Sequence, residues 1–182
     1  SKLEEILKKV EKVSEDTKRK SEDSNRRIKK VSDESKELNK KALRDITEMA
    51  KEVDRVLKEG REDEVKKLLD EVREVVERVR KISEDSVRRS EEVVRRVEEI
   101  NRELLKDSKR VVDEAAERIR EAPEDRVDEA RRRLERLVED NARVVKRSED
   151  ELRKLVEDNR RVSEEIERKL KELLKRVAES VT

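Results

Sequence analysis

The chain has 182 residues, of which 57% are charged and 31% hydrophobic, yet 52 basic and 51 acidic side chains leave a net charge of only +1. It has no aromatic residue, cysteine or histidine, and only one glycine, one proline and one methionine. This composition excludes disulfides and thiolate chemistry and the common nucleophile–base pairs. It also argues against a nucleic-acid partner, which requires a basic excess. Balanced charge with almost no helix breakers predicts long helices.

Two residues divide the chain into three predicted helices. Gly60 can adopt the left-handed conformation that ends a helix, and Pro123 suits the start of a new one. Because both connections are short, consecutive helices should run antiparallel. We therefore expect a single domain over residues 1–182, with helices at about residues 2–58, 62–121 and 124–180.

An 18-residue repeat runs through all three expected helices. Inward positions such as Leu3, Leu7 and Val10 recur 18 and 36 residues later. Eighteen residues are five turns of an unstrained helix, whereas repeats of seven and eleven impose left- and right-handed supercoils. The inward arc of about 120° suits a helix with two neighbours around one core. The sequence therefore predicts an all-α fold, a long, straight, untwisted antiparallel up-down-up three-helix bundle, and leaves open a fourth, external helix.

Serine, threonine and asparagine occupy many inward positions, the reverse of their ordinary surface placement. When the chain is folded back on itself at residues 60 and 123, polar residues from different helices fall at the same height along the helix axes. We call each such group a polar layer. The first layer contains Ser14, Thr17, Asn101, Ser108 and Asn141. The second contains Ser21, Ser24, Asn25 and Ser148. The third contains Ser32, Ser35, Asn39, Ser83, Ser86, Ser90, Asn159 and Ser163.

A buried polar group without a partner costs about 1–3 kcal/mol, so these residues should hydrogen-bond to one another. Such networks determine register at a cost in stability. The alternative interpretation is that they are solvated residues at the boundary of the core.

No candidate catalytic, cofactor-binding or metal-binding residue emerges from the sequence. Adjacent carboxylates such as Glu164 and Glu165 are interleaved with lysine and arginine three or four residues away, which is typical of solvated ion pairs. A Glu-x-x-His metal site is impossible without histidine, and a glycine-rich phosphate loop is impossible with one glycine. We expect no enzyme activity, no cofactor and no small-molecule substrate. No apolar run approaches the ~20 residues of a membrane span, and the N-terminus lacks a signal core, which predicts a soluble, non-secreted protein.

The repeat and the recycled phrases SEDT, SEDS, VEDNARV and VEDNRRV resemble de novo designed, parametrically built helical bundles with buried hydrogen-bond networks. The resemblance covers the whole chain. It implies a structural scaffold without natural activity that requires no partner. The alternative within this class is an interaction module, meaning a subunit of a helical homo- or hetero-oligomer or the frame of a helix-displacement switch. A third hypothesis is a natural coiled coil associated with lipid or the cytoskeleton, although lipid-binding helices favour aromatic residues and a basic interface.

Overall fold

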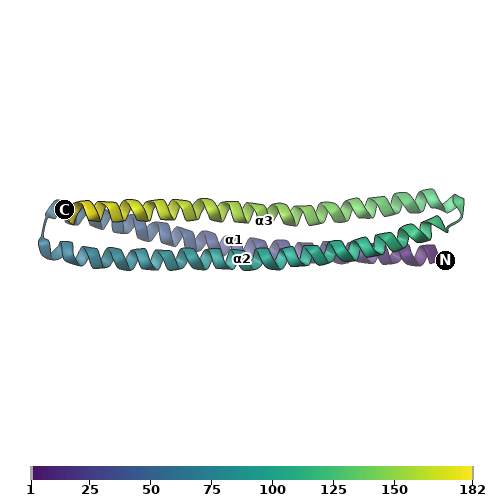
Figure 1. Cartoon of the computed structure of the whole chain (residues 1–182), viewed down its shortest axis with the longest axis horizontal. Coiled ribbons are helices and arrows are strands. Elements are labelled where there is room, and N and C mark those ends of the chain that lie inside the picture. The colour runs from purple at the N-terminus through teal and green to yellow at the C-terminus, as the bar shows by residue number, and fades with distance from the viewer. Residues whose placement is uncertain (1, 182) are drawn as a thin grey trace. The chain divides into compact units, whose positions relative to one another are not determined.

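The computed structural model describes the backbone of residues 2–181 and the side chains of residues 2–180. It contains three long α-helices: α1 (Lys2–Glu59), α2 (Glu62–Arg120) and α3 (Glu124–Val181), labelled in Figure 1. No strand occurs among the described residues. The prediction of an all-α, three-helix fold is confirmed, and each observed helix end lies within one residue of the expected boundary.

The turn between α1 and α2 is built on Gly60. Its φ angle is 63°, in the left-handed region, and its N–H donates to the carbonyl of Val56 at 3.0 Å. This bond closes the end of α1 in the manner of an αL cap. On the other side of the turn, the carbonyl of Arg61 accepts a hydrogen bond from the N–H of Val65 at 3.1 Å, which opens α2.

The turn between α2 and α3 uses proline instead. The N–H of Ala122 donates to the carbonyl of Ile119 at 3.2 Å, and the carbonyl of Pro123 accepts from the N–H of Arg126 at 3.0 Å. Because the first N–H groups of a helix have no intrahelical partner, a residue without an N–H loses nothing there. Pro123 therefore stands directly before α3 at no cost in hydrogen bonding.

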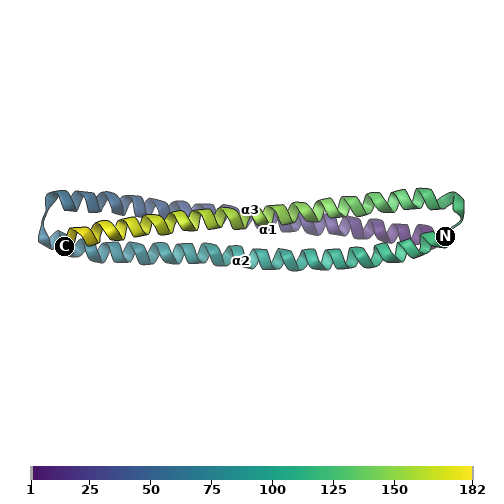
Figure 2. The same cartoon turned by 45° about the horizontal axis from the view of Figure 1, so that its top comes forward.

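Internal contacts divide the chain into two compact units, each built from one segment of every helix. The first unit contains α1 up to Lys29 together with Val93–Lys154. The second contains Lys30–Glu92 together with α3 from Leu155 onward. Within each unit the three segments lie side by side in both views (Figures 1 and 2). The single domain and the untwisted course stay predictions.

Each unit has its own apolar cluster beside a turn. In the first unit, α1 contributes Leu3, Ile6, Leu7 and Val10, which pack with Val111, Ala115, Ile119, Ala130 and Leu134. In the second unit, the cluster consists of Ala42, Ile46, Met49, Val53, Val56, Leu68, Val72, Val75, Val76, Val79, Ile166, Leu170, Leu173 and Val177. Burying side chains of this size stabilises a fold by about 1.5–3 kcal/mol each. These clusters therefore supply much of the driving force for folding, and along the helices the polar layers alternate with further buried apolar residues such as Ile28, Val97 and Leu155.

Four apolar residues that the 18-residue repeat places on the inward arc are exposed, which corrects the expectation that this arc is buried. Leu105, Val138, Val156 and Leu174 are 48%, 38%, 50% and 37% exposed. All four lie in α2 and α3 at one edge of the predicted arc. When a helix has only two neighbours, these neighbours cover the middle of its apolar arc. The edge of the arc that faces away from them stays exposed to solvent.

The register of the antiparallel helices differs slightly from the predicted one. The Arg89 guanidinium pairs with Glu34 at 3.1 Å, and the Asn141 amide donates to Ser108 at 3.4 Å. In each pair the partner lies three residues further along the chain than the folds at residues 60 and 123 predicted. Helical side chains lean toward the N-terminus, so each covers a spot about one residue before its own Cα. In an antiparallel pair the two shifts add to about two of the three residues. The geometry of the turns accounts for the remaining residue.

We predict that Gly60→Ala lowers the free energy of unfolding by about 1 kcal/mol, because the left-handed conformation is strained for a residue with a Cβ. No heavy atom lies within 4 Å of the position that this Cβ would occupy, so the effect should be conformational rather than steric. Urea denaturation followed by circular dichroism measures it. Gly60→Asn is the matched control and should cost less, since asparagine tolerates this conformation. Equal losses in both variants would contradict the strain argument.

Candidate functional site: the buried polar layers

The structure places every residue of the three polar layers at a buried or half-buried position. The buried members are Thr17, Ser21, Ser24, Ser35, Asn39, Ser86, Ser90, Asn101, Asn141 and Ser148. The half-buried members are Ser14, Asn25, Ser32, Ser83, Ser108, Asn159 and Ser163. The helical repeat explains this placement, because positions 18 residues from a buried leucine or valine return to the same face.

Two side-chain hydrogen bonds join helices within the first unit. Ser148 in α3, which is fully buried, donates from its hydroxyl to the side-chain carbonyl of Asn25 in α1 at 3.0 Å. Asn141 in α3 donates from its amide to the hydroxyl of Ser108 in α2 at 3.4 Å. The first bond links two members of the second layer, and the second bond links two members of the first layer.

A hydrogen-bonded chain crosses between helices in the second unit. The Asn159 amide of α3 donates to the hydroxyl of Ser90 in α2. Ser90 in turn donates to the backbone carbonyl of Ser86, one turn earlier, at 2.9 Å. A serine hydroxyl within a helix can satisfy itself on such a carbonyl, which leaves its oxygen free to accept from the asparagine. These three residues belong to the third layer.

Other layer residues are brought into the interior without a partner. Among the described residues, no hydrogen bond reaches the buried hydroxyl oxygens of Thr17, Ser21, Ser24 and Ser35 or the amide nitrogen and oxygen of Asn101. The structure therefore joins some members of each predicted layer and leaves others unpaired. Asn101, expected to bond with Ser108 and Asn141, bonds with neither.

One buried polar atom was missed by the sequence reasoning, which placed the carboxylates outward. Oε2 of Glu64, in the first turn of α2, is shielded from solvent and has no hydrogen-bond partner among the described residues. A signal for this was present in the repeat. The positions 18 and 36 residues after Glu64 are Ile82 and Ile100, and both are half-buried.

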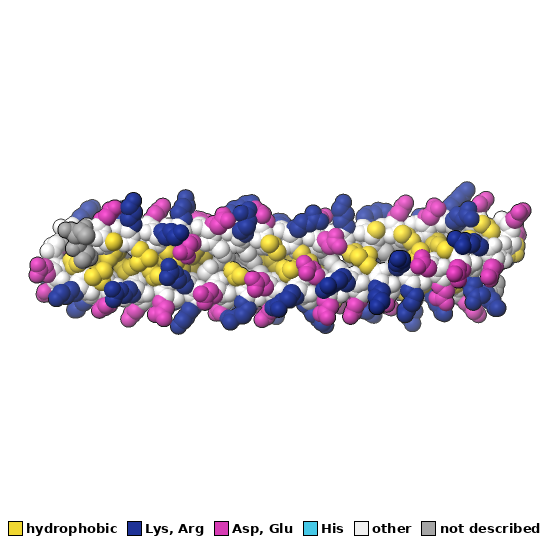
Figure 3. Space-filling model, in the orientation of Figure 1, with side chains coloured by type: hydrophobic (Ala, Val, Ile, Leu, Met, Phe, Trp, Pro, Cys, Tyr) yellow, Lys and Arg dark blue, Asp and Glu magenta, His cyan; other side chains and the backbone are white. Residues whose placement is uncertain are grey.

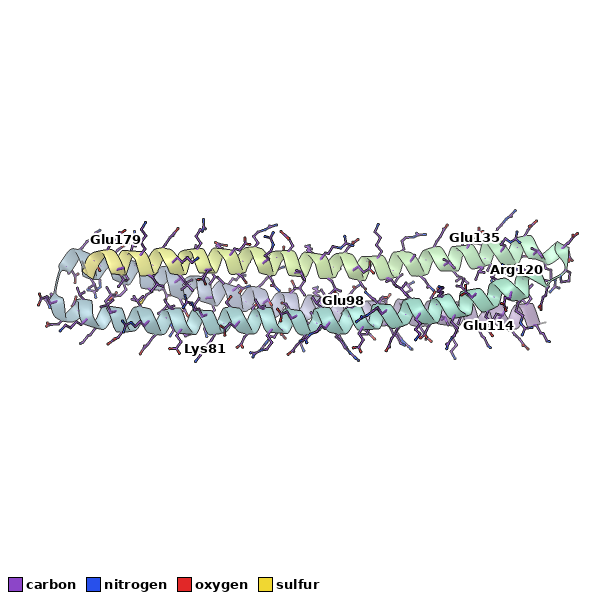
Figure 4. All side chains as sticks on the ribbon, in the orientation of Figure 1. Lys81, Glu98, Glu114, Arg120, Glu135 and Glu179 are labelled. Carbon is purple, nitrogen blue, oxygen red and sulfur yellow. The ribbon has the colours of Figure 1, made fainter. Side chains whose placement is uncertain are left out.

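The remaining charges form a surface network of ion pairs. Lys81, Glu135 and Glu179 are examples of side chains that point away from the packed helices (Figure 4). Within a helix, Arg55 pairs with Glu52 at 2.6 Å and with Glu59 at 2.7 Å. Exposed pairs of this kind contribute about 0–1 kcal/mol each. They favour the helical state and solubility more than they specify which helices meet.

Some pairs connect helices within a unit. In the first unit the Arg133 guanidinium lies between Glu4 and Glu11 of α1. In the second unit Arg176 pairs with Asp54 at 3.1 Å. Because α1 and α3 run in the same direction, these pairs favour their parallel alignment.

Hydrogen bonds from arginine shift the pKa of two exposed glutamates. The hydrogen bond from Arg55 lowers the pKa of Glu52, and the same bond raises the pKa of Arg55. Arg160 lowers the pKa of Glu157 in the same way, at a distance of 2.6 Å. These carboxylates are stabilised in their charged form, which suits a surface ion pair and opposes a role as a proton donor near neutral pH.

No cluster of acidic side chains that could hold a metal ion occurs among the described residues. None of the helices, over the residues that the structure describes, is long and apolar enough to cross a membrane.

Comparison with known proteins identifies a structural likeness and no sequence family. No family model matches the chain, and no curated protein matches it. A solved structure described as a "Computationally designed three helix bundle" superimposes with a TM-score of 0.50, covering 99% of this chain and 86% of that one. The two sequences are 13% identical, so the likeness shows the three-helix fold alone.

We predict that Ser148→Ala destabilises the protein by about 0.5–1.5 kcal/mol, because it removes a buried hydrogen bond to Asn25. Ser35→Ala is the matched control, since it removes a hydroxyl of similar burial that has no partner. This control should be neutral or stabilising. Thermal and urea denaturation of both variants measures the difference. Equal effects would show that the Ser148 bond contributes nothing.

We predict that the pairs at Glu52 and Glu157 add to the acid sensitivity of folding. Their pKa values are lowered in the folded state, so their contribution is present above the usual glutamate pKa of about 4.3. This contribution is lost as the pH falls through the lowered pKa that each glutamate has in the folded state. The double variant Glu52→Gln/Glu157→Gln should therefore show a shallower fall in Tm between about pH 5 and 3 than the parent.

The control for this titration is Glu135→Gln, an exposed glutamate that accepts no hydrogen bond from arginine among the described residues. It should leave the slope of Tm against pH close to that of the parent. High salt should reduce the difference between variants, because exposed pairs are screened. If the double variant keeps the parental slope of Tm against pH, the pairs at Glu52 and Glu157 do not contribute to the acid sensitivity of folding.

Proposed function

We propose that this protein is a designed structural scaffold without natural biochemical activity, whose fold is specified by buried polar layers. The observation that carries the proposal is the placement of the layer residues. All of them are buried or half-buried, and three hydrogen bonds between them join different helices. The likeness to a solved structure described as a computationally designed three-helix bundle supports it at the level of the fold.

The 18-residue repeat explains why such a scaffold needs polar layers. Moving one helix along another by 18 residues returns its apolar arc to the same face, so apolar packing alone discriminates weakly between the two registers. A slip would, however, separate Asn159 from Ser90 and Ser148 from Asn25. Each separation leaves polar groups buried without partners, which costs about 1–3 kcal/mol. The layers therefore act against slipped assemblies.

A non-enzymatic role follows from how the carboxylates are used. Those of Glu52, Glu157 and Asp54 accept hydrogen bonds or ion pairs from arginine on the outside of the helices. An acid–base pair needs carboxyl groups with separated pKa values in a cleft, whereas the shifted pKa values here belong to exposed pairs. The charged coat favours solubility.

A second candidate function is an interaction module that accepts an additional helix or a second copy of the chain. The exposed apolar side chains of Leu105, Val138, Val156 and Leu174 favour it. Figure 3 shows apolar side chains visible among the charged ones on the face in view. The inward positions of α1 between Ser14 and Asn39 are mostly polar, so α1 contributes less apolar burial there than a uniformly apolar helix.

The test compares the parent with the double variant Asn101→Leu/Asn141→Leu. We expect the parent to be a monomer of 21.7 kDa by light scattering. The double variant should keep or raise its Tm, because apolar side chains replace buried polar groups. It should also populate additional masses, since the discrimination between registers is weakened.

Glu98→Leu/Glu135→Leu is the matched control, because it adds the same two leucines at exposed positions. Association in this control equal to that of the double variant would attribute the effect to added hydrophobicity and contradict the role of the layers. A parent mass of 43 kDa or more, about twice 21.7 kDa, would replace the monomeric scaffold with the interaction module.

A further inference from the structure

A cluster of unpaired polar groups lies inside the first unit. Asn101 of α2 is 4% exposed, and both its amide nitrogen and its oxygen are buried without a hydrogen-bond partner among the described residues. On α1, the hydroxyls of Thr17, Ser21 and Ser24 are equally enclosed and equally unpaired. Elsewhere in the same unit, Asn141 and Ser148 have found partners. Within this unit the unpaired groups thus belong to α1 and α2, whereas Asn141 and Ser148 of α3 are paired.

A hollow between α1 and α2 is lined by residues 20–27 of α1 and 96–107 of α2, the stretches that also contain Ser21 and Asn101. Ser24 lines it from α1, and Ile100 and Leu104, which flank Asn101 in the sequence, line it from α2. Its volume is about 250 Å³, and its rim carries both charges, for example Lys20 and Asp23. A buried water needs only ~10–15 Å³ of such space. The hollow therefore reaches Ser24 directly and lies beside the turn of α2 that carries Asn101.

We propose that Asn101, Thr17, Ser21 and Ser24 form a binding site for internal water, in which one or more long-lived molecules bridge the amide to the α1 hydroxyls. Buried waters typically make about three hydrogen bonds to polar groups that would otherwise be unsatisfied. The four side chains match this requirement. The amide supplies two donors and an acceptor, and each hydroxyl supplies one donor and accepts as well.

Water fits this chemistry better than an ion does. The cluster itself contains no charged side chain, and an ion without an opposite charge is costly to bury. Water can donate to the Asn101 carbonyl and accept from its amide with equal ease. The site depends only on the burial of these side chains, so it goes beyond the proposed scaffold function and can be tested separately from it.

Oxygen-17 magnetic relaxation dispersion of the intact protein tests the site, because it detects long-lived water without interference from exchanging hydroxyl protons. The parent should show a dispersion. In Asn101→Leu the dispersion should fall by the amplitude of at least one long-lived water. Ser21→Ala/Ser24→Ala should lower it in the same direction, which keeps the test decisive if the leucine variant is poorly folded. Circular dichroism verifies folding of each variant.

Asn141→Leu is the matched control, since it makes the same change at a buried asparagine of the same unit that already bonds to Ser108. It should retain the parental dispersion. The proposal is overturned if the parent shows no dispersion, if Asn101→Leu retains it in full, or if Asn141→Leu loses it equally. None of these results depends on the oligomeric mass, so a failed water site leaves the scaffold proposal separately testable.

Discussion

Both units enclose serine, threonine and asparagine side chains, and a buried polar group is costly unless it has a hydrogen-bond partner. The apolar clusters beside the two turns are generic, because leucine and valine pack in many registers. The hydrogen bonds from Ser148 to Asn25 and from Asn159 to Ser90 have no such freedom. In the scaffold function that we propose, apolar burial drives association, and the polar layers discriminate between arrangements that apolar burial treats almost equally.

The helical repeat and the polar layers are complementary. A period of 18 residues keeps the inward arc on one face over the length of each helix, but it also makes each segment resemble its neighbours. Polar interruptions such as Asn101 and Ser86 make neighbouring segments chemically different, at the cost of burying groups that prefer water. The surface ion pairs are exposed and screened by salt, so they contribute less to this discrimination.

Much of the fold was predictable because its signals are local. Gly60 and Pro123 gave the helix boundaries, since a left-handed cap and a missing N–H act on the residues next to them. The buried serines, threonine and asparagines all belong to the predicted layers, whereas the shielded Glu64 oxygen does not. The repeat did not identify which of them bond, because the lean of side chains and the turns together move each antiparallel partner by about three residues, nearly one turn. Asn101 has no partner, and Leu105 is exposed at one edge of the predicted arc; both outcomes depend on how a neighbouring helix lies against α2.

The sequence by itself determined the three helices, their inward faces and the position of polar residues on those faces, because helix geometry relates residues within a segment of chain. Only the tertiary structure decided that Ser148 reaches Asn25, that Glu64 places an oxygen away from solvent, and that Asn101 has no partner. These outcomes depend on distances between helices and on side-chain direction across a contact. No periodicity within one helix contains that information.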